Sequence, residues 1–548
     1  MISEDDFSQS YGDLLEDTYD VVDRIVLNAY FPLAQSPGGF RMWWRRLNDG
    51  DDELDNTHLM RLSGRFSRRV RGWAKKNDIP VVLCNERKHL VAEQYLPQNP
   101  EFQGIFLVLV GRAPAPVWDI QRFENGGINI RRKTPMPWVN HYHFHIMDDE
   151  WGHITIKVCG QAPFTAQLML NGHEYVSCLA GKADIGFTKE GNCFTKVSNA
   201  AGLCEVAETL QSSAAVGRLE QVCERWIYQC VCFGLSFDEQ KRSGFHYSYS
   251  VYQVEYSRNL LFTRGGQMEQ LFSGIIDRIR GHLDVKSIKT IFGFKKRPKR
   301  RNTGKQHRCE VVVERPMYNL TVFKVHFGRL TLKMYTKGER VLRIEAIAHN
   351  TTELSCGRVV ERFPRIISRL ASMLERFLNV VRCVDGPWIS NGTFESLPTA
   401  SVVGASRVGG ININSPRIRA AMAAVVALAS APKGFTAAEH ARKVREMHPE
   451  LGAPYTVRQA AYDLKKLRGK NLVRKTSQWS RHYETSSEGL RTMAALVVLR
   501  DKVIVPLLAG LGRRKRGPKP PNQGPLDAHL EKLQSQMQEL FKDMRFVA

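Results

Sequence analysis

The chain of 548 residues lacks the short motifs that identify many common enzymes. It has no Walker-type phosphate loop, no Gly-x-Ser-x-Gly elbow and no zinc-protease helix, which argues against the corresponding hydrolases. Its eleven cysteines are scattered, and only Cys230 and Cys232 lie close together. Neither a zinc knuckle nor a secreted disulfide framework is therefore expected.

Long apolar runs are also missing. No stretch approaches the roughly 18 apolar residues of a membrane span. The acidic start of the chain, which includes Glu4, Asp5 and Asp6, is unlike a signal peptide. We expect no membrane partner, and we expect a cytoplasmic protein associated with the nucleoid.

Acidic residues are absent where basic residues gather. Residues 286–308 hold ten Lys or Arg, residues 61–76 hold seven, and residues 512–519 form a third run without an acid. The formal net charge is +24. Because phosphate contacts supply the sequence-independent part of nucleic-acid binding, DNA or structured RNA is the expected partner. The residues expected to bind it in the first two runs are Arg65, Arg68, Arg69, Lys295, Lys296, Arg297, Lys299, Arg300 and Arg301.

The order of strand-like and helix-like segments predicts an α+β fold with mixed elements. Its clearest feature is a hairpin of residues 142–147 and 153–159. The expected organisation is an N-terminal α/β domain (1–112), a connecting loop (113–136), a central α+β domain (137–388), a linker (389–415), a winged helix-turn-helix (416–510), a basic linker (511–525) and an amphipathic terminal helix (526–548).

The winged helix-turn-helix is predicted from helices at 416–429, 436–448 and 456–469 followed by a small hairpin. Thr436 and Thr456 are natural N-caps. Ala461 and the leucines of the last helix are expected to face inward. The residues expected to contact DNA are Arg458, Gln459, Lys465, Lys466 and Arg468 on the helix, with Gln478, Ser480 and Arg481 at the wing tip. The terminal helix could join two copies into a homo-oligomer.

Three carboxylates lie in apolar, strand-like runs: Asp23, Glu255 and Glu345. A carboxylate in such a run needs compensation, either from an arginine or from a divalent metal. Each has a basic neighbour in the sequence, at Arg24, Arg258 and Arg343 respectively. If the three converge from different strands, they could hold Mg²⁺ and act as the catalytic residues of a nuclease or recombinase.

Two further interpretations stay open. His141, His143 and His145 share one face of a strand and could ligate a metal. The string His143-Phe144-His145 is similar to the metal motif of rolling-circle replication initiators, which also use a tyrosine nucleophile; candidates are Tyr247, Tyr249, Tyr252 and Tyr256. Alternatively, the protein binds DNA or RNA without catalysis. Tryptophans would then stack on bases beside arginines, with candidates Trp43, Trp44, Trp73, Trp138, Arg41, Arg45, Arg46, Arg131 and Arg132.

A broader resemblance covers most of the chain. The strings VDRIVLN, NHYHFHIMDDEWGHITIKV, LNGHEY, YQVEYS, LKMYTKGERVLRIEAIAHN and YDLKKLRGKNLV resemble a widespread family of uncharacterised bacterial proteins. That family occurs in multiple copies per genome, in the manner of a mobile element. The resemblance implies a context of mobile DNA or an associated RNA, and it implies no particular activity.

Overall fold

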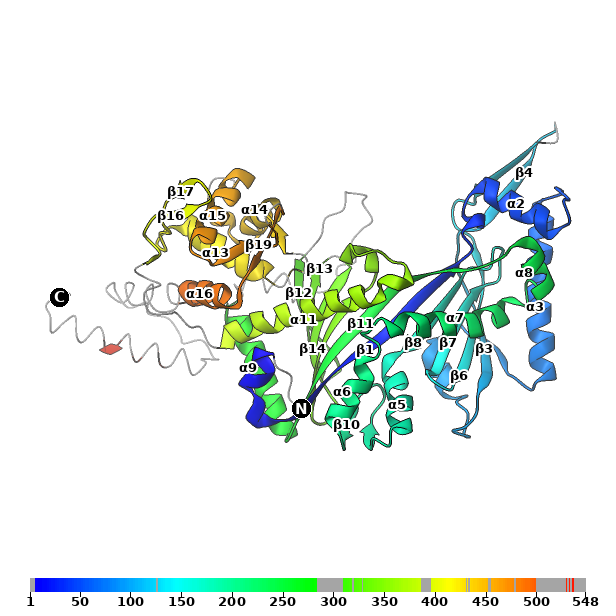
Figure 1. The fold of residues 1–548 in the computed structure, drawn as a ribbon, viewed down its shortest axis with the longest axis horizontal. Helices are drawn as coiled ribbons and strands as arrows, with labels where there is room; N and C mark the ends of the chain where they lie inside the picture. Colours follow the sequence, from blue (N-terminus) through cyan, green and yellow to red (C-terminus); the bar gives the residue numbers. More distant parts are fainter. Residues whose placement is uncertain are drawn as a thin grey trace. The chain divides into compact units, whose positions relative to one another are not determined.

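The protein is described by a computed structural model. The structure describes residues 5–124, 127–282, 309–317, 320–327, 329–385, 396–429, 431, 434–451, 455–477, 480–498, 529, 532 and 535–536. Contacts divide the chain into two units. Unit 1 comprises Met1–Glu4, Tyr11–Glu269 and Arg301–Ser372, and unit 2 comprises Asp5–Ser10, Gln270–Arg300 and Met373–Ala548 (Figure 1).

Unit 1 is built on one eleven-stranded sheet. Its order is β12 (Cys309–Met317), β13 (Leu320–Phe327), β14 (Leu330–Lys337), β15 (Val341–Ala348), β11 (Ser248–Phe262), β1 (Leu15–Tyr30), β8 (Ala166–Asn171), β7 (Gly152–Cys159), β6 (Trp138–Asp148), β3 (Gly104–Pro114) and β2 (Val81–Leu83). Neighbours are antiparallel except β2 and β3. The expected N-terminal and central domains therefore contribute strands to the same sheet. The mixed α+β class is confirmed.

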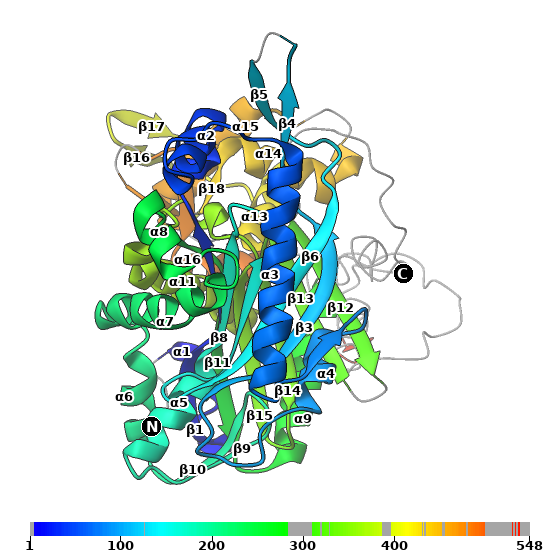
Figure 2. The same cartoon turned by 90° about the vertical axis from the view of Figure 1, so that its right-hand side faces the viewer.

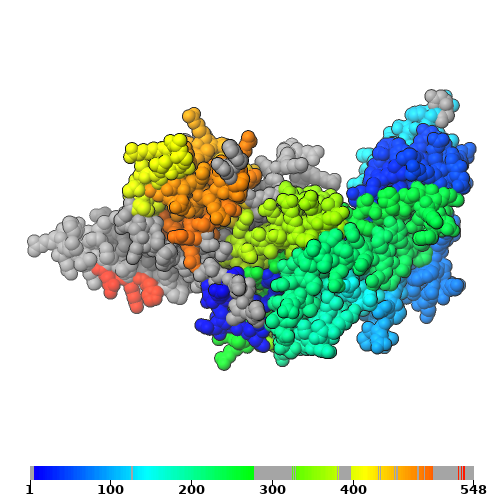
Figure 3. Space-filling view, in the orientation of Figure 1, coloured from blue at the N-terminus to red at the C-terminus, as the bar shows by residue number. Residues whose placement is uncertain are grey.

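The hairpin expected at 142–159 is present as β6 and β7. Their register runs from His141 opposite Cys159 to Asp148 opposite Gly152. The expected loop at 113–136 also contains a hairpin, formed by β4 (Trp118–Arg122) and β5 (Ile128–Arg132). It projects from unit 1 in the space-filling view (Figure 3). Two smaller strands, β9 (Phe187–Lys189) and β10 (Phe194–Val197), pair with each other.

Helices pack against the sheet. Their bounds in unit 1 are α2 (Pro37–Leu47), α3 (Asn56–Lys76), α4 (Lys88–Glu93), α5 (Gly172–Lys182), α6 (Ala200–Glu208), α7 (Ala214–Val231) and α8 (Phe237–Ser243). Phe66 of α3 packs against Tyr142 of β6 and stacks on Phe164. Figure 2 shows α3 lying in front of the sheet. Since side chains alternate along a strand, the neighbours of Tyr142, His141 and His143, point to the opposite face.

Two helices cross the boundary between the units, α9 (Gly265–His282) and α11 (Phe363–Asp385). Unit 2 contains α1 (Asp6–Ser10), β16 (Ser401–Val403), β17 (Ser406–Val408), α13 (Pro416–Leu428), β18 (Phe435–Thr436), α14 (Ala437–Met447), α15 (Val457–Gly469), β19 (Val473–Lys475), β20 (His482–Thr485) and α16 (Ser487–Val498). The strands β18, β20 and β19 form a small sheet in that order.

The predicted N-caps of unit 2 are confirmed. Thr436 and Thr456 each form a capping box, with Glu439 and Gln459 respectively. The prediction for Ala461 is wrong, because this side chain is exposed, whereas Leu464 and Leu467 are buried. The hairpin of β16 and β17 was not predicted. It packs on α15, where Ser401 and Val403 surround Gly469.

Candidate functional site

The three predicted carboxylates lie on three neighbouring strands of the sheet, β1, β11 and β15. Glu345 pairs with Ser257, two residues from Glu255 on β11. Asp23 lies at an irregularity of β1 between Val22 and Ile25, opposite the same part of β11. Burial, followed by the charges of Glu345 and Asp23, raises the pKa of Glu255. The structure thus brings the three acids together.

An arginine lies among these acids. Arg343 is fully buried, and its Nη1 is 3.2 Å from Asp23 Oδ2 and 3.7 Å from Glu345 Oε1. Its Nε donates to Asn259 Oδ1 at 2.6 Å. The sequence allowed either an arginine or a divalent metal to balance the charge of these carboxylates. In the structure, Arg343 does so for Asp23 and Glu345.

His173 completes the buried cluster. Its Nδ1 is 3.1 Å from Asp23 Oδ1, and its Nε2 is 3.1 Å from Arg343 Nη2. Arg343 can only donate, so Nε2 accepts and the proton lies on Nδ1. Burial lowers the pKa of His173, and Arg343 lowers it further against the opposing effect of Asp23. His173 is therefore neutral.

Asp23 is ionised. Burial alone would raise its pKa, but the interactions with His173, Arg343 and Asn192 hold the pKa well below its ordinary value. Asn192 donates to Asp23 Oδ1 at 2.9 Å. The carboxylate oxygens therefore already have three donors. We name Asp23, His173, Arg343, Asn259 and Glu345 the buried charge cluster.

The local sequence explains how His173 reaches Asp23. Strand β8 ends at Asn171, whose side chain caps α5 by accepting from the backbone N–H of His173. The backbone of Gly172 then passes against β1: an added Cβ would lie 1.6 Å from Val22 O. Only glycine allows this approach. The string Asn171-Gly172-His173 was the signal in the sequence, and its role was not predicted.

The outer side of the cluster is less buried. Tyr335 donates to Glu345 Oε1 at 2.5 Å, and Lys333 Nζ lies 3.5 Å from Glu345 Oε2. Among the residues that the structure describes, no group of three or more His, Cys, Asp or Glu is arranged to hold a metal ion. With Arg343 and Lys333 beside the carboxylates, these residues do not fit the Mg²⁺ that the sequence suggested.

The histidine row does not form a metal centre either. His145 Nδ1 lies 3.0 Å from His153 Nε2, while His141 Nδ1 lies 3.2 Å from Val139 O. Burial, followed by repulsion from lysines, lowers the pKa of His141 to about 4 and that of His143 to about 2. These imidazoles are neutral side chains of the sheet.

The candidate tyrosine nucleophiles mostly have structural partners. Tyr249 donates to Glu224 Oε1 at 2.7 Å, and Tyr256 donates to Asp20 Oδ2 at 2.7 Å. Tyr247 is buried and donates to the backbone oxygen of Phe164. Burial raises the pKa of Tyr247 and Tyr249, which opposes their use as nucleophiles. This geometry gives no support to a replication initiator.

The best-defined cationic surface lies on α3. This helix has no Asp or Glu, and it buries Leu59, Leu62, Phe66, Val70 and Ala74. Its exposed cations, which have no described ion pair, are Arg61, Arg68, Arg69, Arg71, Lys75 and Lys76. We name these six residues the α3 basic face. Arg65 does not belong to it, because it pairs with Glu239 at 2.7 Å and donates to Gly234 O.

The four candidate tryptophans differ in exposure. Trp43 and Trp44 are buried, so they cannot stack on bases. Trp73 is half-buried beside Phe233. Trp138 is 62% exposed, at the base of the projecting hairpin of β4 and β5. Arg112 Nη2 donates to its backbone oxygen at 3.2 Å, and Arg131 is exposed nearby in the sequence.

The candidate residues of unit 2 lie on or near α15. Arg458 is exposed, while Gln459, Lys465, Lys466 and Arg468 are half-buried. Lys466 Nζ lies 5.2 Å from the ring centre of Tyr462. Ser480 is half-buried and Arg481 is exposed, next to β20.

Several predicted residues lie outside the described residues. They include the basic block 286–308 with Lys295, Lys296, Arg297, Lys299, Arg300 and Arg301, the wing residue Gln478, and nearly all of the terminal helix 526–548.

Comparisons with known proteins give no match among family models, curated proteins or solved structures. Within the described part of the chain, no helix has the length and apolar character needed to cross a membrane.

Proposed function

We propose that the protein binds nucleic acid and that the α3 basic face is a main contact surface of unit 1. One observation carries the proposal: six exposed cations lie along a single helix of 21 residues that has no acid. At about 1.5 Å per residue, such a helix is roughly 30 Å long. It can therefore follow several phosphates of a backbone, and phosphate contacts give affinity without sequence specificity.

The exposed Trp138 supports the same proposal. It lies beside Arg112, and Arg131 and Lys133 are exposed in the adjoining hairpin. An exposed aromatic ring next to cations is the usual platform for unpaired bases. This surface favours contact with single-stranded regions in addition to phosphates.

In unit 2 we propose a winged helix-turn-helix that recognises double-stranded DNA. The order α13, β18, α14, α15, β19 and β20 agrees with that module. Its recognition helix would be α15, and Arg458 in the first turn would reach base edges. The hairpin of β16 and β17 packs at Gly469, so the first half of α15 is the part open to DNA.

The resemblance to a multi-copy bacterial family favours the DNA of a mobile element as the partner. A structured RNA is the alternative partner for the same cations. We do not extend the proposal to cleavage, because Arg343 and Lys333 lie beside the carboxylates that would hold a catalytic metal.

The proposal is tested with a variant of the α3 basic face, Arg68→Gln/Arg71→Gln/Lys75→Gln. A matched control, Lys182→Gln/Lys196→Gln/Lys241→Gln, removes the same charge from exposed lysines elsewhere in unit 1. Fluorescence anisotropy with duplex DNA should show weaker binding by the α3 variant than by the control. Equal binding by both variants would reject α3 as the contact surface. Sequencing of nucleic acid that co-purifies with the wild type distinguishes DNA from a discrete RNA.

A further inference from the structure

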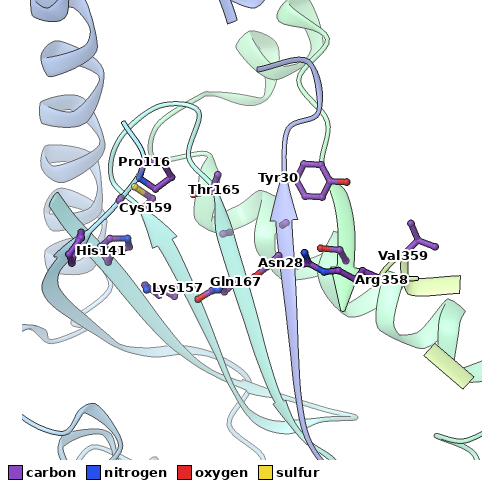
Figure 4. Close-up of a pocket in the computed structure, with 15 residues that line it drawn as sticks. Asn28, Tyr30, Pro116, His141, Lys157, Cys159, Thr165, Gln167, Arg358 and Val359 are labelled. Carbon is purple, nitrogen blue, oxygen red and sulfur yellow. Dashed lines mark hydrogen bonds between the residues drawn. The ribbon is translucent and has the colours of Figure 1, made fainter. Parts of the chain in front are cut away.

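A pocket opens on the polar face of the sheet in unit 1, away from the buried charge cluster. Its volume is about 570 Å³. Polar side chains of β1, β6, β7 and β8 line it (Figure 4). Pockets of this size are large enough for a small organic ligand. Sequence patterns did not indicate it, because its lining residues come from seven separated segments.

The floor of the pocket belongs to one row of paired residues. Ser250 pairs with Asn28, Asn28 with Gln167, Gln167 with Lys157, and Lys157 with His143. Directly paired residues of neighbouring strands have their side chains on the same face. The row is therefore a continuous polar stripe across five strands. Figure 4 shows Lys157, Gln167 and Asn28 side by side, with Arg358 next to Asn28.

The pocket is cationic. Of its described lining residues, Lys157 and Arg358 are basic and none is Asp or Glu. Neither cation has an ion pair among the described residues, and Arg358 Nε is buried without a hydrogen-bond partner. Burial, with repulsion from Lys88, lowers the pKa of Lys157. Each of the two side chains can therefore donate to an anionic or carbonyl group of a ligand.

The remaining polar groups suit a base or a sugar. Gln167 Nε2 donates to Asn28 Oδ1 at 2.9 Å, which leaves Asn28 Nδ2 as a donor and Gln167 Oε1 as an acceptor. His141 uses Nδ1 toward Val139 O, so its Nε2 can accept. Tyr30 and Pro116 add apolar surface at the wall.

We propose that this pocket binds one nucleotide unit, with its phosphate at Lys157, its base edge at Asn28 and Gln167, and Arg358 donating to the base from beyond Asn28. The nucleotide can be free or can belong to a single strand. The second form rests on the nucleic-acid binding proposed above, whereas the first does not. In either form the pocket is a binding site separate from the α3 basic face.

Calorimetric titration of the full chain tests the proposal with the four 5′-mononucleotides, inorganic phosphate and a short single-stranded oligonucleotide. Lys157→Met and Arg358→Met are the pocket variants, and Lys196→Met removes an exposed lysine as the control. Each pocket variant should lower the affinity roughly tenfold to hundredfold, as the loss of one charge-assisted hydrogen bond predicts. Lys157→Arg, which keeps the charge, should retain most of the affinity.

The outcomes separate the two sources of the nucleotide. Mononucleotide binding that exceeds phosphate binding and falls in the pocket variants supports a free nucleotide. Binding only of the oligonucleotide, with the same variant effects, supports a strand. Unchanged affinities in folded Lys157→Met and Arg358→Met would overturn the proposal, as would a wild type that binds none of these ligands. Because the α3 variant should keep mononucleotide binding, failure of the pocket and failure of the α3 surface are distinguishable.

Discussion

Arg343 Nη1 lies 3.2 Å from Asp23 Oδ2, although the two residues are 320 positions apart in the chain. Both side chains are almost completely buried. Their contact joins β15 to β1 across β11, and His173 adds α5 to the same cluster. Buried charges depend strongly on their partners, so this cluster should determine the stability of unit 1 more than any surface ion pair.

Removal of one charge from the cluster should be strongly destabilising. Arg343→Met leaves Asp23 and Glu345 without their buried cation, and we expect a loss of about 3–5 kcal/mol in unfolding free energy. The ion pair of the exposed Arg131 with the half-buried Asp119 provides the control, since Arg131→Met should cost at most about 1 kcal/mol. Urea denaturation followed by circular dichroism measures both. The double variant Asp23→Asn/Arg343→Met should lose less than the sum of the single variants; strictly additive losses would contradict the contact.

The junction between β8 and α5 requires glycine at position 172, whereas the glycine at position 181 of the same helix can be replaced. Gly172→Ala would place a Cβ 1.6 Å from Val22 O, and we expect a loss of several kcal/mol or a failure to fold. Gly181 lies in the same helix with no atom within 4 Å of the added Cβ. Gly181→Ala should therefore be stabilising, by about 0.5–1 kcal/mol. Thermal unfolding of the two variants compares them directly, and similar melting temperatures would count against the structure of this junction.

The stability of unit 2 should decrease in mild acid. His440 is buried in α14 with Nε2 2.9 Å from Ala421 O, and burial lowers its pKa from 6.5 to about 4. Below pH 6.5 the unfolded chain binds a proton that the folded chain does not, so folding weakens as the pH falls toward 4. The shift corresponds to at most roughly 3 kcal/mol.

Scanning calorimetry across this pH window provides the measurement. His440→Gln should reduce the dependence of the melting temperature on pH, whereas His482→Gln, at a half-buried position of β20, should leave it unchanged. A pH dependence that is identical in wild type and His440→Gln would show that this histidine is not the linked group.

Magnesium should be dispensable for binding. Because Arg343 and Lys333 lie beside the acids, we expect that removal of divalent ions by a chelator changes neither the melting temperature nor the affinity for DNA. The variants Glu255→Gln and Glu345→Gln test whether any effect of Mg²⁺ depends on these two carboxylates. If Mg²⁺ raises the melting temperature or supports DNA cleavage, and both variants abolish that effect, a metal site exists and this interpretation is wrong.

Local patterns predicted local structure well. The hairpin of β6 and β7 and the caps Thr436 and Thr456 depend on residues close in sequence, and all three are present. The expected alternation of buried and less buried residues is found in β7, whereas β6 is buried continuously from His141 to Ile146. The sequence also placed Asp23, Glu255 and Glu345 on strands that could converge. It could not show that the compensating group of Asp23 is Arg343 rather than Arg24, because that choice depends on the pairing of β1, β11 and β15.

Sequence patterns also failed to predict which of the candidate side chains are buried. The string Trp43-Trp44-Arg45-Arg46 suggested a surface for stacking, yet both tryptophans are buried, and of the four candidate tryptophans Trp138 alone is exposed. Arg65, unlike Arg68, faces Glu239 of α8 and the backbone oxygen of Gly234, neighbours that are distant in sequence. The nucleotide pocket depends in the same way on strand order, which no single segment specifies.

The most direct test of the central claim is the salt dependence of DNA binding. The slope of the logarithm of the affinity against the logarithm of the salt concentration is negative, and its magnitude falls by about 0.9 for each phosphate contact removed. Arg68→Gln/Arg71→Gln/Lys75→Gln should therefore reduce the slope by roughly 2–3, while Lys182→Gln/Lys196→Gln/Lys241→Gln should leave it near the wild-type value. Equal slopes for the wild type and both variants would contradict a phosphate-binding role for α3.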